Sequence, residues 1–144
     1  MASSVFSESD LASIRDAVGE AELRTSAEIR VYLDKHVKDD PLDHAAYLFK
    51  KLGMSATALR NGVMIYIAYA DRKFCIIGDV GIHQHVGDHF WITISTKMEE
   101  AFRAGLMREG VTNAVREVGE ALAAHFPRMK NDINELSDEV QTGF

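Results

Sequence analysis

The sequence predicts an α/β fold, a three-layer α/β/α sandwich in which a small mixed sheet carries helices on both faces. Helix-period apolar patterns alternate with strand-like runs along the chain. The length of 144 residues suits one domain, and the hydrophobic fraction of 47% is ordinary for a globular protein. We expect the domain to span residues 1–127, followed by an acidic, partly ordered tail over residues 128–144.

The first half of the chain predicts the order helix, strand, helix. Ser7 and Asp10 have the spacing of a capping box, in which each side chain binds the other residue's backbone N–H at a helix start. Residues 29–34 alternate apolar and polar side chains, which is typical of a strand. An aspartate before Pro41 begins a second helix, and Gly53 is suited to end it.

The second half predicts a hairpin followed by two helices. Residues 63–69 are apolar on both faces, as in a central strand, and residues 74–77 return antiparallel to it. The first two strands enclose a helix, so we expect them to be parallel. After a loop, the last helices are expected at residues 88–104 and 111–125.

Charge and cysteine content exclude several classes of function. Subtracting 22 acidic from 16 basic residues gives a net charge of −6, which argues against non-specific binding to nucleic acid or anionic membranes. Cys75 is the single cysteine, so no internal disulfide forms and a reducing, cytoplasmic location is expected. The first residues lack a signal-peptide pattern, and the longest apolar run, residues 63–70, is too short for a membrane anchor.

Glycines, aspartates and histidines concentrate in the segment from Gly78 to His89. Carboxylates on a glycine-rich loop suit hard cations such as Ca²⁺ or Mg²⁺, so Asp79 and Asp88 are candidate ligands. His83 could instead serve Zn²⁺. The structural alternative is that Asp79 caps a turn, Asp88 caps the following helix, and the histidines are solvated.

Asp34 and Asp71 form a second candidate pair. Each follows one of the two parallel strands, so both should lie at the same end of the sheet, where open α/β sheets usually bind ligands. Asp71 could also be part of a charged, solvated turn. A regular hairpin places Asp79 at the opposite end, near Glu28 and Asn61, so the two acidic pairs should be separate sites.

Several segments resemble the TPM domain family, named for thylakoid-lumen, photosystem-repair and acetylcholine-receptor-modulating members. The resemblance is carried by residues 26–31, 45–53, 61–65 and, most strongly, 71–82. The chain looks like the short, stand-alone bacterial branch of that family. This resemblance implies an α/β/α sandwich, and it brings two activities, acid phosphatase in plant members and binding of divalent cations, notably calcium, in others.

The first functional hypothesis is therefore a domain that binds a divalent cation and has a regulatory or protein-maintenance role. Its expected metal ligands are Asp79, Asp88 and His83, with Asp71 and Asp34 as a second set, and Ca²⁺ or Mg²⁺ is favoured over Zn²⁺. One alternative is a weak, metal-dependent acid phosphatase. The other is an interaction module without catalysis, whose protein partner the sequence does not identify.

Overall fold

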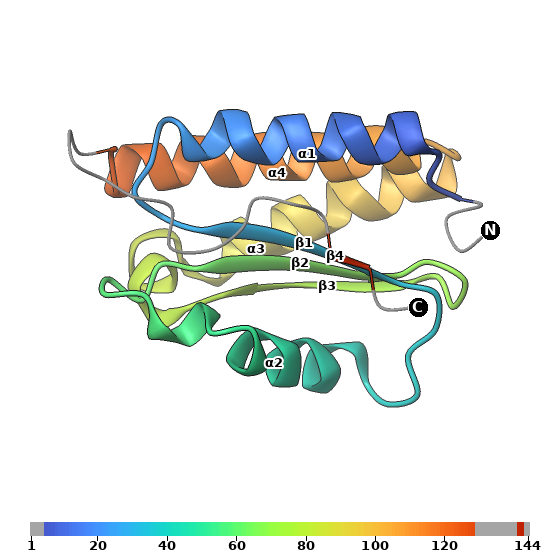
Figure 1. Cartoon of the computed structure of the whole chain (residues 1–144), viewed down its shortest axis with the longest axis horizontal. Coiled ribbons are helices and arrows are strands. Elements are labelled where there is room, and N and C mark those ends of the chain that lie inside the picture. Colours follow the sequence, from blue (N-terminus) through green and yellow to red (C-terminus); the bar gives the residue numbers. More distant parts are fainter. Residues whose placement is uncertain (1–4, 129–140, 143–144) are drawn as a thin grey trace.

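A mixed β-sheet separates two helical layers, as Figure 1 shows. The computed structural model describes residues 5–128 and 141–142. The elements, in chain order, are α1 (Glu8–Glu22), β1 (Ile29–Asp34), α2 (Pro41–Lys51), the short 3₁₀ turn η1 (Met54–Ala56), β2 (Val63–Ala68), β3 (Lys73–Gly78), α3 (Val80–Arg103), α4 (Met107–His125) and β4 (Gln141–Thr142). The predicted three-layer α/β/α sandwich is confirmed.

The strand order in the sheet is β3-β2-β1-β4. Strands β1 and β2 are parallel, with Ile29 opposite Val63, and β3 runs antiparallel to β2, with Gly78 opposite Val63. Both pairings were predicted. The two-residue strand β4 pairs in parallel with β1, which the sequence analysis did not foresee.

Alternating residues of the strands build two apolar cores. Val31 and Ile65 belong to the larger core, together with side chains of α1, α3 and α4. Met64 and Tyr66 belong to the smaller one, which α2 covers. Because successive side chains of a strand point to opposite faces, this division follows from the strand pattern.

The predicted starts of the first two helices are confirmed by their capping contacts. Ser7 and Asp10 bind each other's backbone N–H groups, both at 3.0 Å. Asp40 caps α2 by accepting the Leu42 N–H at 2.8 Å. Gly53 has φ of 78°, the left-handed conformation expected after a helix end.

The prediction that residues 78–89 form a loop is wrong, because α3 begins at Val80 instead of Asp88. Asp79 accepts the Val80 N–H and caps this earlier start. Ile82 is fully buried in the larger core and fixes the first turn. Gly87 is non-helical, with φ of 73° and ψ of 176°, so α3 consists of two helical segments that meet at a kink. Asp88 directly follows the kink, at the position where the sequence predicts a helix start.

The final helix also begins earlier than predicted, at Met107 instead of Val111. In the tail, Ile133, Leu136 and Val140 are the apolar residues that the sequence offers as anchors, and these three lie outside the described residues. No helix in the described part of the chain combines the length and apolar character needed to cross a membrane.

Candidate functional site

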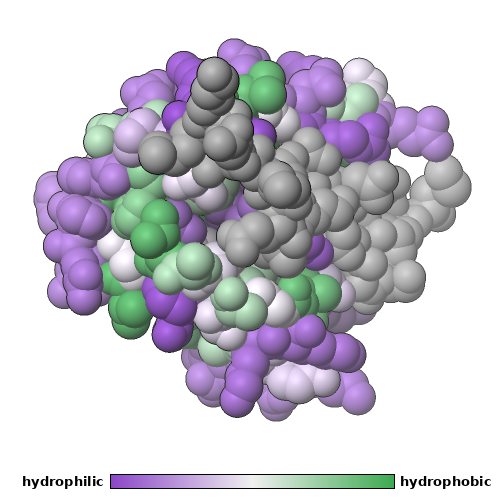
Figure 2. Space-filling view, turned by 60° about the vertical axis from the view of Figure 1, so that its left-hand side comes forward, coloured by the Kyte–Doolittle hydropathy of each residue, from purple (hydrophilic) through white to green (hydrophobic). Residues whose placement is uncertain are grey.

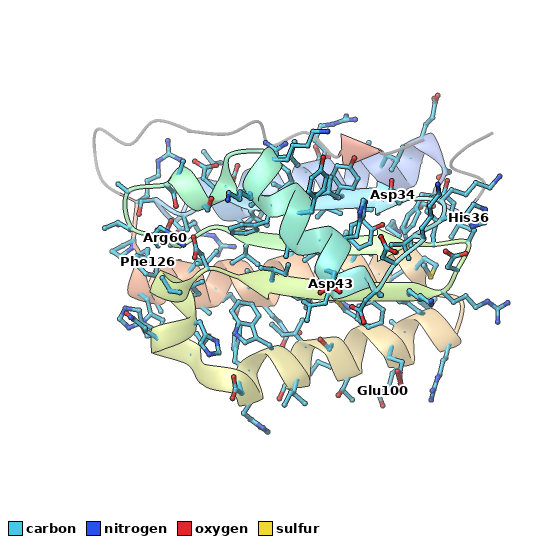
Figure 3. The ribbon with its side chains drawn as sticks, turned by 90° about the horizontal axis from the view of Figure 1, so that it is seen from below. Asp34, His36, Asp43, Arg60, Glu100 and Phe126 are labelled. Atoms are coloured by element: carbon cyan, nitrogen blue, oxygen red, sulfur yellow. The ribbon has the colours of Figure 1, made fainter. Side chains whose placement is uncertain are left out.

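Polar side chains gather at the two ends of the sheet. Figure 3 shows Asp34 and His36 at one end, and Arg60 and Phe126 at the other. The first end holds the carboxyl ends of the parallel strands β1 and β2. The second holds the start of α3, including Asp79.

Asp34 is a buried carboxylate with polar neighbours on two elements. Its side chain is 7% exposed. The Tyr66 hydroxyl donates to Oδ2 at 2.6 Å, and His44 Nε2 lies 3.5 Å from the same oxygen. Burial raises the pKa of Tyr66, and the hydrogen bond to Asp34 raises it further. The phenol therefore stays a neutral donor beside the carboxylate.

Asp71 binds the loop that follows β1. One oxygen lies 2.8 Å from His36 Nδ1, and the other accepts the Val37 backbone N–H at 2.8 Å. The His36 hydrogen bond, followed by the Val37 N–H, lowers the pKa of Asp71. These contacts join the β2–β3 hairpin to the β1–α2 loop.

The bond to Asp71 sets the orientation of the His36 ring. An ionised carboxylate only accepts hydrogen bonds, so Nδ1 carries the proton that it shares with Asp71. In neutral His36 the lone pair is then on Nε2. The His36 side chain is 64% exposed, so Nε2 is the ring nitrogen available to a metal ion or a proton. Metal-binding histidines are often oriented by a carboxylate in this way.

We define the strand-end cluster as Asp34, His36, His44 and Asp71. Salt bridges from Asp34 and Asp71 within the described residues are to histidines only. Lys73 acts on Asp71 through its charge but makes no salt bridge with it.

At the opposite end, Asp79 is compensated by a permanent cation. Arg60 donates from Nε to Oδ2 at 2.7 Å and from Nη2 to Oδ1 at 2.9 Å. The Val80 N–H donates to Oδ1 at 2.7 Å. A metal ion at Asp79 would have to displace or approach the arginine.

Asp88 and His83 also lie at this end. Their contact is 3.3 Å from His83 Nε2 to an Asp88 side chain that is 88% exposed. His83 Nδ1 accepts the Trp91 indole N–H at 3.0 Å, which places the neutral ring's proton on Nε2. Neutral His83 therefore has no free lone pair for a metal ion while Trp91 is bound.

The structure places the predicted residues at the ends that the topology indicates. Asp34 and Asp71 share one end. Asp79 lies at the other end, where its backbone N–H donates to the Gly62 carbonyl. At the same end, the Val63 N–H at the start of β2 donates to the Glu28 carbonyl. Within residues 5–128 and 141–142, no three or more His, Cys, Asp or Glu side chains are grouped as metal ligands.

Sequence reasoning missed the partners of these aspartates. The sequence shows no evident partner for His36, and it favours a packing or surface role for His44 on its helix. The parallel register could have indicated a partner for His36. Asp34 lies opposite Ala68, so His36, two positions later, lies beside the turn that follows β2. Arg60 precedes β2 in a loop, and no periodic pattern indicates its bond to Asp79.

Comparisons with known proteins agree with this fold. A model of the TPM domain matches residues 2–121. The NMR structure of the BA42 protein from the psychrophilic bacterium Bizionia argentinensis is similar with a TM-score of 0.88 and 39% identity, over 96% of this chain and 95% of that one. The N-terminal domain of the cg2496 protein from Corynebacterium glutamicum shares the fold at a TM-score of 0.65 and 16% identity, over 81% and 74% of the chains. No curated protein matches the chain.

Proposed function

The chain belongs to the TPM domain family, and we propose that it binds a divalent cation at the strand-end cluster. The observation that carries this proposal is the contrast between the aspartates. In the described part of the chain, Asp79 has an arginine partner, whereas the ionic contacts of Asp34 and Asp71 are to histidines. A bound cation would give these carboxylates a direct ionic partner, which neither Arg72 nor Lys73 of the neighbouring hairpin provides.

Asp71 is the direct ligand that we propose. Its side chain is 26% exposed, so a hydrated ion can reach it, whereas the side chain of Asp34 is buried. Mg²⁺ commonly keeps several waters and takes only one or two protein carboxylates. Ca²⁺ prefers more oxygen ligands, so the small number of carboxylates supports weak binding, with a Kd on the order of a millimolar.

We propose a regulatory role for this binding. Asp71 already joins the β2–β3 hairpin to the β1–α2 loop through His36 and Val37. An ion that takes an Asp71 oxygen competes with these bonds and changes how the two segments are held.

The test is a titration of the full chain with Mg²⁺, Ca²⁺ and Zn²⁺, followed by amide NMR shifts at constant ionic strength. We expect Mg²⁺ or Ca²⁺ to shift residues near Asp71, and Asp71→Asn to remove the effect. Asp16→Asn removes one negative charge from an exposed position of α1, and this control should leave the metal-induced shifts unchanged. Shifts that survive Asp71→Asn but disappear in Asp79→Asn or Asp88→Asn would place the ion at the other end and overturn the proposal.

The two alternative functions stay predictions. For phosphatase chemistry, Cys75 offers no ready nucleophile, because burial raises the pKa of its thiol to about 12. Figure 2 brings the Arg60–Asp79 end forward and shows apolar side chains on that surface. Leu59 and Val80 are exposed large hydrophobics beside this pair in the sequence. They are the surface residues to test for an interaction module.

A further inference from the structure

A cavity lies beside the β2–β3 hairpin, where α3 ends and α4 begins. These segments share the end of the molecule at which α1 starts (Figure 1). The cavity has a volume of about 570 Å³, which is within the range of small-molecule sites, about 300–1,000 Å³. The strand-end cluster contributes no lining residue to it.

Aromatic and aliphatic side chains form the apolar lining of this cavity. Phe74 on β3 and Phe102 on α3 meet edge to face, with ring centroids 5.2 Å apart. Ile67 and Met107 extend the apolar lining onto β2 and α4. Such a surface favours the hydrocarbon part of a ligand, because binding removes apolar area from water.

Three basic side chains also line the cavity, Arg72, Lys73 and Arg103. Arg103 lies 3.3 Å from Glu99, the one acidic lining residue. Arg72 and Lys73 form no salt bridge with any described residue. The charge of Lys73 acts on Asp71 without a direct ion pair. Two cations that are free of salt bridges with the described residues, at an apolar cavity in a chain of net charge −6, favour an anionic group.

The backbone at Arg72 adds to this observation. Its φ is 56°, a left-handed conformation that glycine adopts at little cost and that a long side chain rarely adopts. Arginine at this position of a tight turn therefore makes the fold less stable than glycine would. Strain of this kind is concentrated at ligand-binding positions.

We propose that this cavity binds a small organic anion that has an apolar body and one anionic head group. The head group contacts Arg72 and Lys73, and the body lies on Phe74 and Phe102. This site is independent of the proposed cation site. Asp71 is the neighbour of Arg72 in the chain, but its carboxylate binds the β1–α2 loop.

The test compares octanoate with 1-octanol, which has the same chain length without the charge. Amide NMR shifts of the full chain are followed at constant pH and ionic strength. We expect octanoate to shift residues around Phe74 and Phe102 and to bind about tenfold or more tightly than octanol, as a charge-assisted contact requires. Equal affinity for the two probes, or octanoate shifts elsewhere, would overturn the proposal.

Two variants test the cationic contacts separately from folding. Arg72→Gly removes the cation and places the favoured residue in the left-handed turn, so the chain should remain folded. We expect Arg72→Gly and Lys73→Gln each to weaken octanoate binding about tenfold. Arg15→Gln removes a matched positive charge from the exposed side of α1 and should leave binding unchanged. Unchanged octanoate affinity in both Arg72→Gly and Lys73→Gln would contradict the assigned site. An equal loss in these two variants and in the Arg15→Gln control would contradict it as well.

Discussion

Arg60 and Asp79 form a two-bond pair across the start of α3, at 2.7 Å from Nε to Oδ2 and 2.9 Å from Nη2 to Oδ1. The backbones also meet here, because the Gly81 N–H donates to the Arg60 carbonyl at 2.7 Å. Asp79 simultaneously caps α3 through the Val80 N–H. One aspartate thus joins the first turn of a helix to the loop that leads into β2.

Removing the arginine should destabilise the protein. The Asp79 side chain is 6% exposed and that of Arg60 is 50% exposed, so Arg60→Ala leaves a buried carboxylate with only its capping contact. We expect the free energy of unfolding to be lower than that of wild type, as measured by urea denaturation. Arg15→Ala, on exposed α1, is the matched control. A loss no larger than that of the control would show that the pair contributes little.

Local signals predicted much of the fold. The capping box of Ser7 and Asp10 and the Asp40–Pro41 start depend on neighbouring residues, so they are readable in the sequence. The α3 start was missed because Gly78, Gly81 and Gly87 were interpreted as loop residues. Ile82 is buried by tertiary packing, and this packing outweighs the low helix propensity of glycine.

The site was predictable only as far as topology extends. Parallel pairing of β1 and β2 placed Asp34 and Asp71 at one end of the sheet. The contacts of these aspartates depend on loop conformation. His36 and Asp71 are 35 residues apart, and Arg60 and Asp79 are 19 apart. No helix or strand period connects such positions. The parallel register indicates only that His36 lies beside the turn that holds Asp71, and it gives no signal for the Arg60–Asp79 pair.

Gly81 should be more sensitive to substitution than Gly78. A Cβ on Gly81 would collide with the backbone carbonyl oxygens of Leu59 and Arg60, which cannot move without shifting the loop. A Cβ on Gly78 would meet the Trp91 side chain, which can rotate away. We expect Gly81→Ala to cost about 1–3 kcal/mol in the free energy of unfolding and Gly78→Ala to cost less. Denaturation of both variants checks this order, and the reverse order would contradict it.

The lowered pKa of Asp71 predicts a specific acid sensitivity. Hydrogen bonds from His36 and Val37 favour its charged form, so their contribution to stability is complete above the ordinary aspartate pKa, about 3.9. It is lost as the pH falls through the lower, folded-state pKa. We expect wild type to exceed Asp71→Asn in unfolding free energy at about pH 5, and this difference to shrink toward about pH 2. Asp16→Asn is the control, and a difference for Asp71→Asn that stays constant over this range would refute the assignment.

Cys75 should be unreactive in the folded protein. Burial, followed by the charge of Asp40, raises the pKa of its thiol to about 12, and Sγ lies 3.5 Å from the Pro41 carbonyl oxygen. The thiolate is the nucleophile, and an unfolded thiol has a pKa of about 8.5. Alkylation by iodoacetamide at about pH 8 should therefore be slower in native than in urea-unfolded chain, on the order of a thousandfold. Cys75 is the only cysteine, so mass spectrometry reports its modification directly. Equal rates in the two states would mean that the thiol is exposed and ionises normally.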